Sequence, residues 1–307
     1  MRRSAFTMIE LIFVIVIMGI IGKFGTEFLA QAYESFIFSN TNNKLQARSA
    51  KAVEFISSRL QYRIKDSVIA RTGTVAAPGA PIGIGDAGAT ANIQILEWVS
   101  TDIDGFRGVT NPYWSGIIDL NPSTANRLAS PRIDPITPII NTDTALINAL
   151  IQTLSDGNST IADAALYFIG SNSDATTSYG YQAGGLTDQS GAMHPINSDA
   201  TPDGFISAFT APLINFAGVD LYEYYKLAWT ANAIVWSAAN GGTLTYYYNY
   251  QPWNNIHIAN AKTKSRVIME GISTFQFMSI GSIIKIQVCA GDNLVEDYSL
   301  CKEKTIF

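Results

Sequence analysis

Histidine and cysteine are scarce in this chain, and charged side chains of either sign are few. With two His and two Cys in 307 residues, a Cys/His zinc site could form only with carboxylate ligands. The 20 Lys and Arg against 25 Asp and Glu give a net charge of −5, and no basic tract favours a nucleic-acid partner. Apolar residues make up 47%, which excludes a mainly disordered chain.

Catalytic signatures are also missing. The chain has no HExxH and no GxSxG motif, and His194 and His257 are expected to be surface or packing residues. Residues 83–88 form a GxGxxG pattern, but Pro78 and Pro81 precede it and no helical pattern follows, which excludes a dinucleotide site. We therefore predict no catalytic residue and no enzymatic activity, and a membrane-tethered hydrolase has no motif to support it.

A long apolar run near the amino terminus is the most informative feature. Residues 1–5 are basic through Arg2 and Arg3, and residues 6–28 are almost wholly apolar. A helix of that length spans about 34 Å, enough to cross a bilayer. The Arg pair places the amino terminus in the cytoplasm. The sequence thus predicts a single membrane-spanning helix with the rest of the chain on the far side.

Glu10 does not fit a plain membrane anchor. It lies about one turn inside the apolar run, where an unpaired carboxylate costs roughly 2.5–3.5 kcal/mol. No Lys or Arg follows at three or four residues on the apolar side. Cleavage before Phe6 would create an amino group at a matching depth on a neighbouring copy. We expect Glu10 to neutralise that amine in an assembly.

Residues 5–12, AFTMIELI, resemble the leader junction of type IV pilins and type II secretion pseudopilins. That family has a short basic leader ending in Gly or Ala, then Phe, then Glu as the fifth mature residue, then an apolar helix. The leader here ends in Ala5 rather than the commoner Gly. The resemblance implies cleavage between Ala5 and Phe6 by a prepilin peptidase, followed by N-methylation of Phe6.

The resemblance further implies a minor subunit that assembles with other pilin-like subunits into a pilus or pseudopilus. It would start in the bacterial inner membrane with a periplasmic head, then pass into a filament or to the cell surface. Three alternatives stay open: a secretory signal peptide cut between Gly19 and Gly25, a plain single-pass anchor, and a membrane-anchored adhesin or binding protein. The sequence does not separate secretion, competence, adhesion and motility systems.

The helical pattern continues beyond the apolar run. No proline interrupts it, and apolar residues recur at three- and four-residue steps, which predicts one nearly continuous helix from Phe6 to Ile64. Residues 29–65 form its amphipathic continuation, which should pack one stripe on the head from Leu45 onward. The polar stretch 39–43 weakens the pattern, and a kink or break is expected at residues 40–43. The predicted fold class is α+β, with this helix packed on a mainly antiparallel β-sheet head at 66–307.

Within the head we predict an insertion at about residues 100–210. A helix is expected over 144–154, capped by Asp143 or Thr142, and a polar surface loop over 171–204. The predicted strands and turns are 93–99, 165–169, 227–236, 243–250, 267–277 and 282–288, with hairpins at Asn240–Gly241–Gly242 and around Gly281.

Cys289 and Cys301 are close in the sequence near the carboxyl terminus. If the head lies outside the cytoplasm, a disulfide between them would persist and contribute about 3 kcal/mol. Many members of the resembling family close a carboxyl-terminal loop in this way. We predict this disulfide.

Neither a metal ligand nor a cofactor is assigned. The 171–204 segment carries Asp174, Asp188, Asp199 and Asp203, whose spacing matches no EF-hand; a solvated loop is favoured and calcium is left open. Aromatic residues crowd 222–253, where alternating side chains should pack one sheet face. Because three of them are consecutive, at 246–248, some aromatic area is expected to face a partner or ligand.

Overall fold

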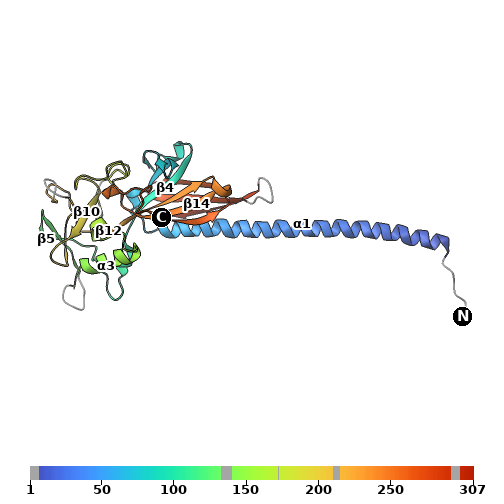
Figure 1. Ribbon diagram of the computed structural model, residues 1–307, viewed down its shortest axis with the longest axis horizontal. Helices are drawn as coiled ribbons and strands as arrows, with labels where there is room; N and C mark the ends of the chain where they lie inside the picture. Colours follow the sequence, from blue (N-terminus) through green and yellow to red (C-terminus); the bar gives the residue numbers. More distant parts are fainter. Residues whose placement is uncertain (1–6, 133–139, 172, 210–214, 292–297) are drawn as a thin grey trace.

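The computed structural model describes residues 7–132, 140–171, 173–209, 215–291 and 298–307. One long helix projects from a head made of antiparallel sheets, which confirms the predicted α+β class (Figure 1). The amino-terminal end of the helix lies far from the head, and the carboxyl terminus lies beside the helix where it enters the head.

Helix α1 runs without interruption from Met8 to Leu60, a length of about 80 Å. The break expected at residues 40–43 does not occur. Asn, Ser and Thr are weak helix formers, but the Thr41 and Leu45 side chains are buried against the head, and this packing outweighs local propensity.

Only the last third of α1 packs on the head. Residues 8–40 are exposed, so burial against the head begins at Thr41, one helical turn before the expected Leu45. Just ahead of it, the Phe38 ring lies 5.3 Å from the Tyr298 ring of the head. From Thr41 onward one stripe of the helix is buried against the strands of the head, and Lys304 pairs with Glu54 at 2.6 Å beside it. The buried helix residues are Thr41, Leu45, Ser49, Ala52, Val53, Ile56, Ser57 and Leu60.

The main sheet is antiparallel and has the order β15-β14-β13-β4-β1-β2, with β3 paired to β1. Its strands are β1 (Ile69–Thr74), β2 (Ala77–Pro78), β3 (Ile82–Gly83), β4 (Ile93–Ser100), β13 (Thr230–Ser237), β14 (Thr243–Tyr250) and β15 (Lys264–Glu270). The predicted hairpin at Asn240–Gly241–Gly242 joins β13 to β14 and is confirmed.

A second sheet of three antiparallel strands lies against α1: β16 (Ile272–Ile280), β17 (Ile283–Gly291) and β18 (Ser299–Ile306). The predicted hairpin around Gly281 joins β16 to β17. The prediction of a single strand over 267–277 is wrong. Gly271 has a positive φ of 67° and separates β15 from β16, which belong to different sheets.

The chain between β4 and β13 builds a third unit. The two strands pair directly, so the intervening segment leaves and re-enters the main sheet at neighbouring positions. The insertion predicted at about residues 100–210 extends to Trp229, because the predicted strand 227–236 is divided there between two sheets. Its described residues form a six-stranded antiparallel sheet in the order β12-β9-β10-β11-β6-β5, a two-stranded ladder, two α-helices and a short 3₁₀ helix at Ile161–Asp163.

The elements of this unit lie at the end of the molecule away from the projecting helix (Figure 1). The predicted helix 144–154 is present, and the Asp143 carboxylate accepts hydrogen bonds from the first-turn amides of Ala145 and Leu146. The bounds are α2 (Ile103–Arg107), β5 (Asp119–Thr124), β6 (Arg127–Ala129), β7 (Pro131–Arg132), β8 (Ile140–Asn141), α3 (Thr144–Leu154), β9 (Ala165–Phe168), β10 (Met193–Ser198), β11 (Gly204–Ser207) and β12 (Tyr225–Ala228).

The segment 171–204 is not the surface loop that its polar composition predicts. It contains β10, and Tyr179 and Tyr181 are buried against the main sheet. Gly180, with a φ of 79°, allows this close approach: a Cβ there would lie 2.5 Å from the Cα of Trp253. Tertiary packing of aromatic rings therefore overrides the local loop signal.

Candidate functional site

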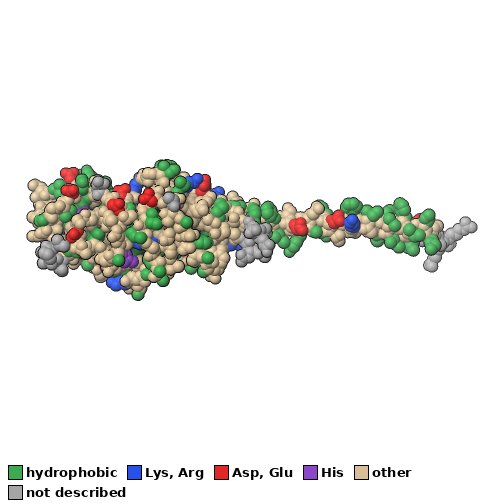
Figure 2. All heavy atoms as spheres, turned by 90° about the horizontal axis from the view of Figure 1, so that it is seen from above, with side chains coloured by type: hydrophobic (Ala, Val, Ile, Leu, Met, Phe, Trp, Pro, Cys, Tyr) green, Lys and Arg blue, Asp and Glu red, His purple; other side chains and the backbone are tan. Residues whose placement is uncertain are grey.

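The projecting helix, residues 8–40 of α1, is the candidate site, because it carries a long exposed apolar surface. In Figure 2 apolar side chains cover most of it, with a few charges between. It contains a stretch long and apolar enough to cross a membrane, and that stretch is not covered by the head. The projecting helix is therefore compatible with a single-pass membrane anchor.

Glu10 lies at the start of the projecting helix, and its carboxylate has a partner within the chain. Glu10 Oε2 accepts hydrogen bonds from the Thr7 backbone N–H at 3.2 Å and from Thr7 Oγ1 at 3.1 Å. Sequence reasoning missed this contact, although Thr followed three residues later by Glu is a helix-start signal. Ala5 and Phe6, the predicted processing residues, lie outside the described residues.

The other charges of the apolar stretch are at its far end. Lys23 Nζ lies 3.9 Å from Glu27, one helical turn away, and both side chains are exposed. Thr26 Oγ1 donates to the Lys23 carbonyl at 2.9 Å, so this polar side chain is satisfied by the helix itself. Residues 11–22, between Glu10 and Lys23, contain no ionisable side chain.

A second apolar face lies between Glu27 and the head. At 100° per residue, its members occupy one half of the helix circumference, while Glu27, Gln31 and Glu34 occupy the other half. The described residues of the head do not cover this face. Its exposed members are Phe28 (70%), Leu29 (67%), Tyr33 (67%), Phe36 (66%) and Ile37 (38%).

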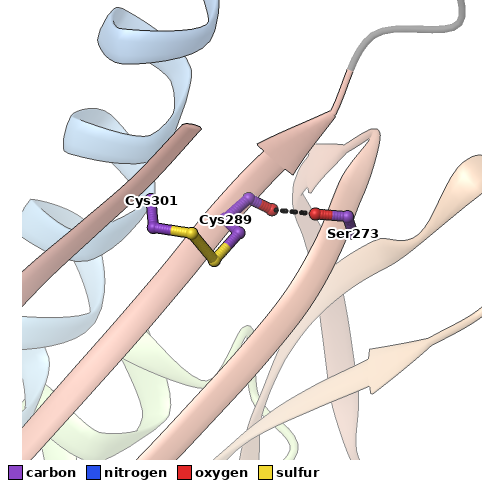
Figure 3. The surroundings of a disulfide bond; sticks show 3 residues. All are labelled: Ser273, Cys289 and Cys301. Atoms are coloured by element: carbon purple, nitrogen blue, oxygen red, sulfur yellow. Dashed lines mark hydrogen bonds between the residues drawn. A yellow bond between two sulfur atoms is a disulfide. The ribbon is translucent and has the colours of Figure 1, made fainter. Parts of the chain in front are cut away.

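Cys289 and Cys301 form the predicted disulfide (Figure 3). They are directly opposed on β17 and β18, so the bond ties two neighbouring strands of the sheet that holds α1. The Cys289 carbonyl accepts a hydrogen bond from Ser273 Oγ on β16 at 3.1 Å, which links the third strand to the same point. The disulfide therefore has a structural position rather than a place in an open cleft.

Arg71 and Glu97 form a buried ion pair in the head. Arg71 Nε lies 2.8 Å from Glu97 Oε2, and Tyr250 donates to the other Glu97 oxygen at 3.0 Å. Arg71 also donates to the carbonyls of Gly79 and Tyr181. Burial raises the pKa of Glu97, and Arg71 opposes that rise. Because the carboxylate and guanidinium are surrounded by protein partners, this network joins strands and has no open position for a substrate.

Sequence reasoning did not single out this network, yet a signal was present. Glu97 is the one charged residue in the apolar strand β4, and Arg71 is the one charged residue in β1. A lone charge within a buried strand needs an opposite partner nearby. The pairing itself depends on the antiparallel register of β1 and β4, which the sequence alone did not define.

The four loop aspartates considered for calcium do not form one site. Asp174 accepts hydrogen bonds from Thr176 and Thr177, and Asp188 accepts from Ser190. Asp199 and Asp203 both pair with Arg127 at 2.7 Å. Within the described residues, three or more His, Cys, Asp or Glu side chains do not meet in a way that could hold a metal ion.

His194 is a packing residue, as expected. It lies on β10, is 3% exposed, and its Nδ1 is 3.2 Å from Gln189 Oε1. His257 makes a contact with Asn255 Oδ1 at 3.1 Å. The two rings lie on different elements and in different hydrogen-bonded surroundings, so they do not form a catalytic pair. Five of the ten crowded aromatic residues are buried, Trp236, Tyr247 and Tyr248 are partly buried, and Tyr222 and Tyr224 are exposed.

Burial of His194 predicts an acid-sensitive head. Burial lowers the pKa of His194 to about 4. At a pH below about 6.5, the ordinary pKa of histidine, the unfolded chain therefore binds the proton more readily than the folded chain. Stability should therefore fall as the pH drops from 6.5 to 4. Between pH 7 and 4.5 this residue should account for about 2.5 kcal/mol of lost unfolding free energy. His194→Gln should remove that loss in urea unfolding of the full chain in detergent.

The buried carboxyl of Asp102 changes stability with pH in the opposite direction, so Asp102 is left unmutated in the comparison. Burial raises its pKa to about 6, so the stability it contributes is present at low pH and is lost as the pH rises through 6. Because Asp102 is unchanged in both proteins, the difference between them isolates His194. An equal acid loss in the wild type and in His194→Gln would contradict the prediction.

No family model, curated protein or solved structure matches this chain. What the described residues offer is a projecting apolar helix, one carboxylate near its start, and a disulfide-linked head. Such an arrangement can anchor the chain in a membrane or pack it against other helices. Function must be inferred from these features.

Proposed function

We propose that this chain is a structural subunit of a pilin-like filament rather than an enzyme. The projecting helix supports this most directly. It contains an apolar stretch long enough to span a bilayer, and the same helix continues without a break to the head. In this proposal the helix first anchors the chain in the bacterial inner membrane, with the head in the periplasm. It then packs beside other pilin-like subunits.

The proposal includes processing of the amino terminus. A prepilin peptidase cuts between Ala5 and Phe6, and Phe6 is N-methylated, as the resemblance of residues 5–12 implies. Mass spectrometry of the native amino-terminal peptide tests this step: the expected peptide begins with N-methyl-Phe6. A native chain that keeps Met1, or that begins beyond Lys23, would rule out the proposal.

Glu10 is proposed to have two roles in succession. In the single chain its carboxylate bonds to Thr7 at the helix start. In the assembly it neutralises the Phe6 amine of a neighbouring subunit, because a charge in an apolar core is strongly unfavourable without a partner. The two roles need different chemistry: a capping contact needs only an acceptor, whereas neutralisation needs the negative charge.

Two substitutions separate these roles. Glu10→Gln keeps an acceptor for Thr7 but removes the charge, and it should lower incorporation into filaments by at least about tenfold while membrane insertion is unchanged. Thr7→Ala removes the side-chain partner but keeps the charge, and it should assemble nearly as well as the wild type. Quantitative immunoblotting of filament and membrane fractions measures both.

Normal assembly of Glu10→Gln together with poor assembly of Thr7→Ala would show that Glu10 acts through helix capping alone. Normal assembly of both variants would remove the proposed charge role. The membrane-anchored binding protein remains the rival function, and the exposed Tyr222 and Tyr224 are the residues it would use. Glycan binding that is lost on Tyr222→Ala and Tyr224→Ala, together with normal export of Glu10→Gln, would favour that rival.

A further inference from the structure

An exposed turn between α3 and the 3₁₀ helix Ile161–Asp163 carries a sequence that the proposed filament role does not use. Asn158, Ser159 and Thr160 form an N-x-S/T motif, the acceptor pattern for N-linked glycans on exported proteins. One other asparagine, Asn121, has Ser or Thr two residues later, but Pro122 lies between them and excludes that site. Residues 158–160 are therefore the only N-x-S/T motif of the chain without proline. Residues 156–160, DGNST, also fit the longer D-x-N-x-T form that bacterial oligosaccharyltransferases accept.

The turn has open space around it. Asp156 and Gly157 have positive φ angles of 53° and 78°, and the Gly157 N–H donates to the Gln152 carbonyl at 2.8 Å, which ends α3. A Cβ added at Gly157 would have nothing within 4 Å. The Asp156 and Asn158 side chains are exposed. A glycan on Asn158 can therefore extend into solvent without displacing the head.

The hydrogen bonds of the Asn158 side chain are compatible with a glycan. Its Nδ2 donates to the Ser155 carbonyl at 2.9 Å and lies 3.5 Å from the Asp156 carbonyl, at the limit of a hydrogen bond. This nitrogen carries two hydrogens, and N-glycosylation replaces one of them. The remaining hydrogen can keep the shorter bond, so the modified asparagine fits the same turn.

The other two residues of the motif are held by the folded head. Ser159 is 2% exposed, and its Oγ donates to Asn249 Oδ1 at 2.8 Å. The Thr160 N–H donates to the Asp163 carboxylate at 2.8 Å, and the Thr160 side chain accepts from the Asp163 backbone N–H. An enzyme that reads the Thr160 hydroxyl must compete with these contacts. Attachment of a glycan is therefore expected before this segment folds.

We propose that Asn158 is N-glycosylated while the head is exported, by an oligosaccharyltransferase that uses a polyprenyl-diphosphate-linked oligosaccharide. Asn158 Nδ2 loses one proton to a base of that enzyme and forms a bond to the anomeric carbon of the sugar. The bond from that carbon to the diphosphate oxygen breaks, and the polyprenyl diphosphate leaves with its electron pair. This inference rests on one part of the proposed function, export of the head, and not on filament assembly.

Mass spectrometry of the native full-length chain and its variants tests the site. The wild-type peptide that contains Asn158 should carry the mass of one oligosaccharide. Asn158→Gln and Thr160→Ala should both lose this mass. Thr160→Ser keeps the hydroxyl of the motif and should keep the glycan, which separates recognition of the motif from the packing of Thr160. An unmodified Asn158 in the wild type, or a glycan that persists in Asn158→Gln, would overturn the proposal.

The excluded motif at Asn121 offers a gain-of-function test. Residues 119–123, DLNPS, have the same acidic, asparagine and hydroxyl positions, and the Asn121 side chain is exposed on β5. Pro122→Ala should therefore add a second oligosaccharide, and Pro122→Ala combined with Ser123→Ala should carry only the first. A chain that still has one glycan in Pro122→Ala would contradict attachment directed by this motif.

Two other peptides of the same digest keep this inference distinguishable from the proposed function. The amino-terminal peptide reports processing at Phe6, and the linked Cys289–Cys301 peptide reports an oxidising compartment. An unmodified Asn158 in a processed, disulfide-linked chain would overturn the glycan and leave the filament proposal standing. A glycosylated Asn158 in a chain that keeps Met1 would support the glycan and rule out the filament proposal.

Discussion

Replacing Arg71 by Met should destabilise the head by about 3–5 kcal/mol, because it leaves the Glu97 carboxylate buried without a cation. Glu97 is 1% exposed, so water cannot take over the role of the guanidinium. Arg71 also donates to the Gly79 and Tyr181 carbonyls, and both acceptors would lose those bonds. Urea unfolding of the full chain in detergent at pH 7 measures the effect.

The charge part of this loss can be separated from the hydrogen bonds. Without Arg71, the pKa of Glu97 should rise further because burial is no longer opposed, so the variant should be less impaired at pH 5 than at pH 8. Arg71→Met combined with Glu97→Gln should regain part of the stability, since no charge remains buried. A loss below about 1 kcal/mol in the single variant would show that the pair is not needed.

Replacing Gly242 by Ala should have a comparably large effect at the junction of two sheets. Gly242 has a φ of 100°, and a Cβ there would lie 1.7 Å from the Ile272 carbonyl oxygen. That oxygen also accepts a hydrogen bond from Trp236 Nε1 at 2.8 Å, and the Ile272 N–H donates to Gly242 at 2.9 Å. The methyl group must push β16 away from the end of the β13–β14 hairpin.

We expect Gly242→Ala to cost more than about 3 kcal/mol, because backbone strain and a clash with backbone act together. Gly281→Ala is the matched control: Gly281 also has a positive φ, of 59°, but nothing lies within 4 Å of an added Cβ. That variant should lose only about 1–2 kcal/mol. Thermal unfolding of both chains measures the difference, and equal losses would argue against the clash.

The sequence was sufficient where one local signal decides the structure. The long helix follows from its apolar run and lack of proline, the β13–β14 turn from Asn240 and the two glycines after it, and the α3 cap from Asp143. The disulfide was predicted on a different ground, namely the resemblance and the expected compartment, together with the closeness of the two cysteines.

The sequence was insufficient where a continuous pattern belongs to two sheets. Residues 264–280 alternate as strands should, yet Gly271 divides them between the main sheet and the sheet beneath α1. The same happens at Trp229, between β12 and β13. Local periodicity reports which residues are extended but not which neighbour they pair with.

The candidate site was only partly predictable for a similar reason. The apolar run and Glu10 were visible in the sequence, but the extent of the projecting helix depends on where the head begins to cover it, at Thr41. The Thr7 contact of Glu10 could have been found from the spacing of the two residues.

Because α1 is unbroken, the direction in which the head faces is fixed relative to the apolar stretch of the projecting helix. One residue added within 29–40 would turn everything beyond it by about 100° and advance it by about 1.5 Å. Seven added residues would return the part beyond them to within about 20° of its original orientation, while lengthening the projecting helix by about 10.5 Å. Insertions of seven residues can therefore lengthen the projecting helix during evolution with little rotation of the head. Insertions of other lengths would also turn the head to face another direction.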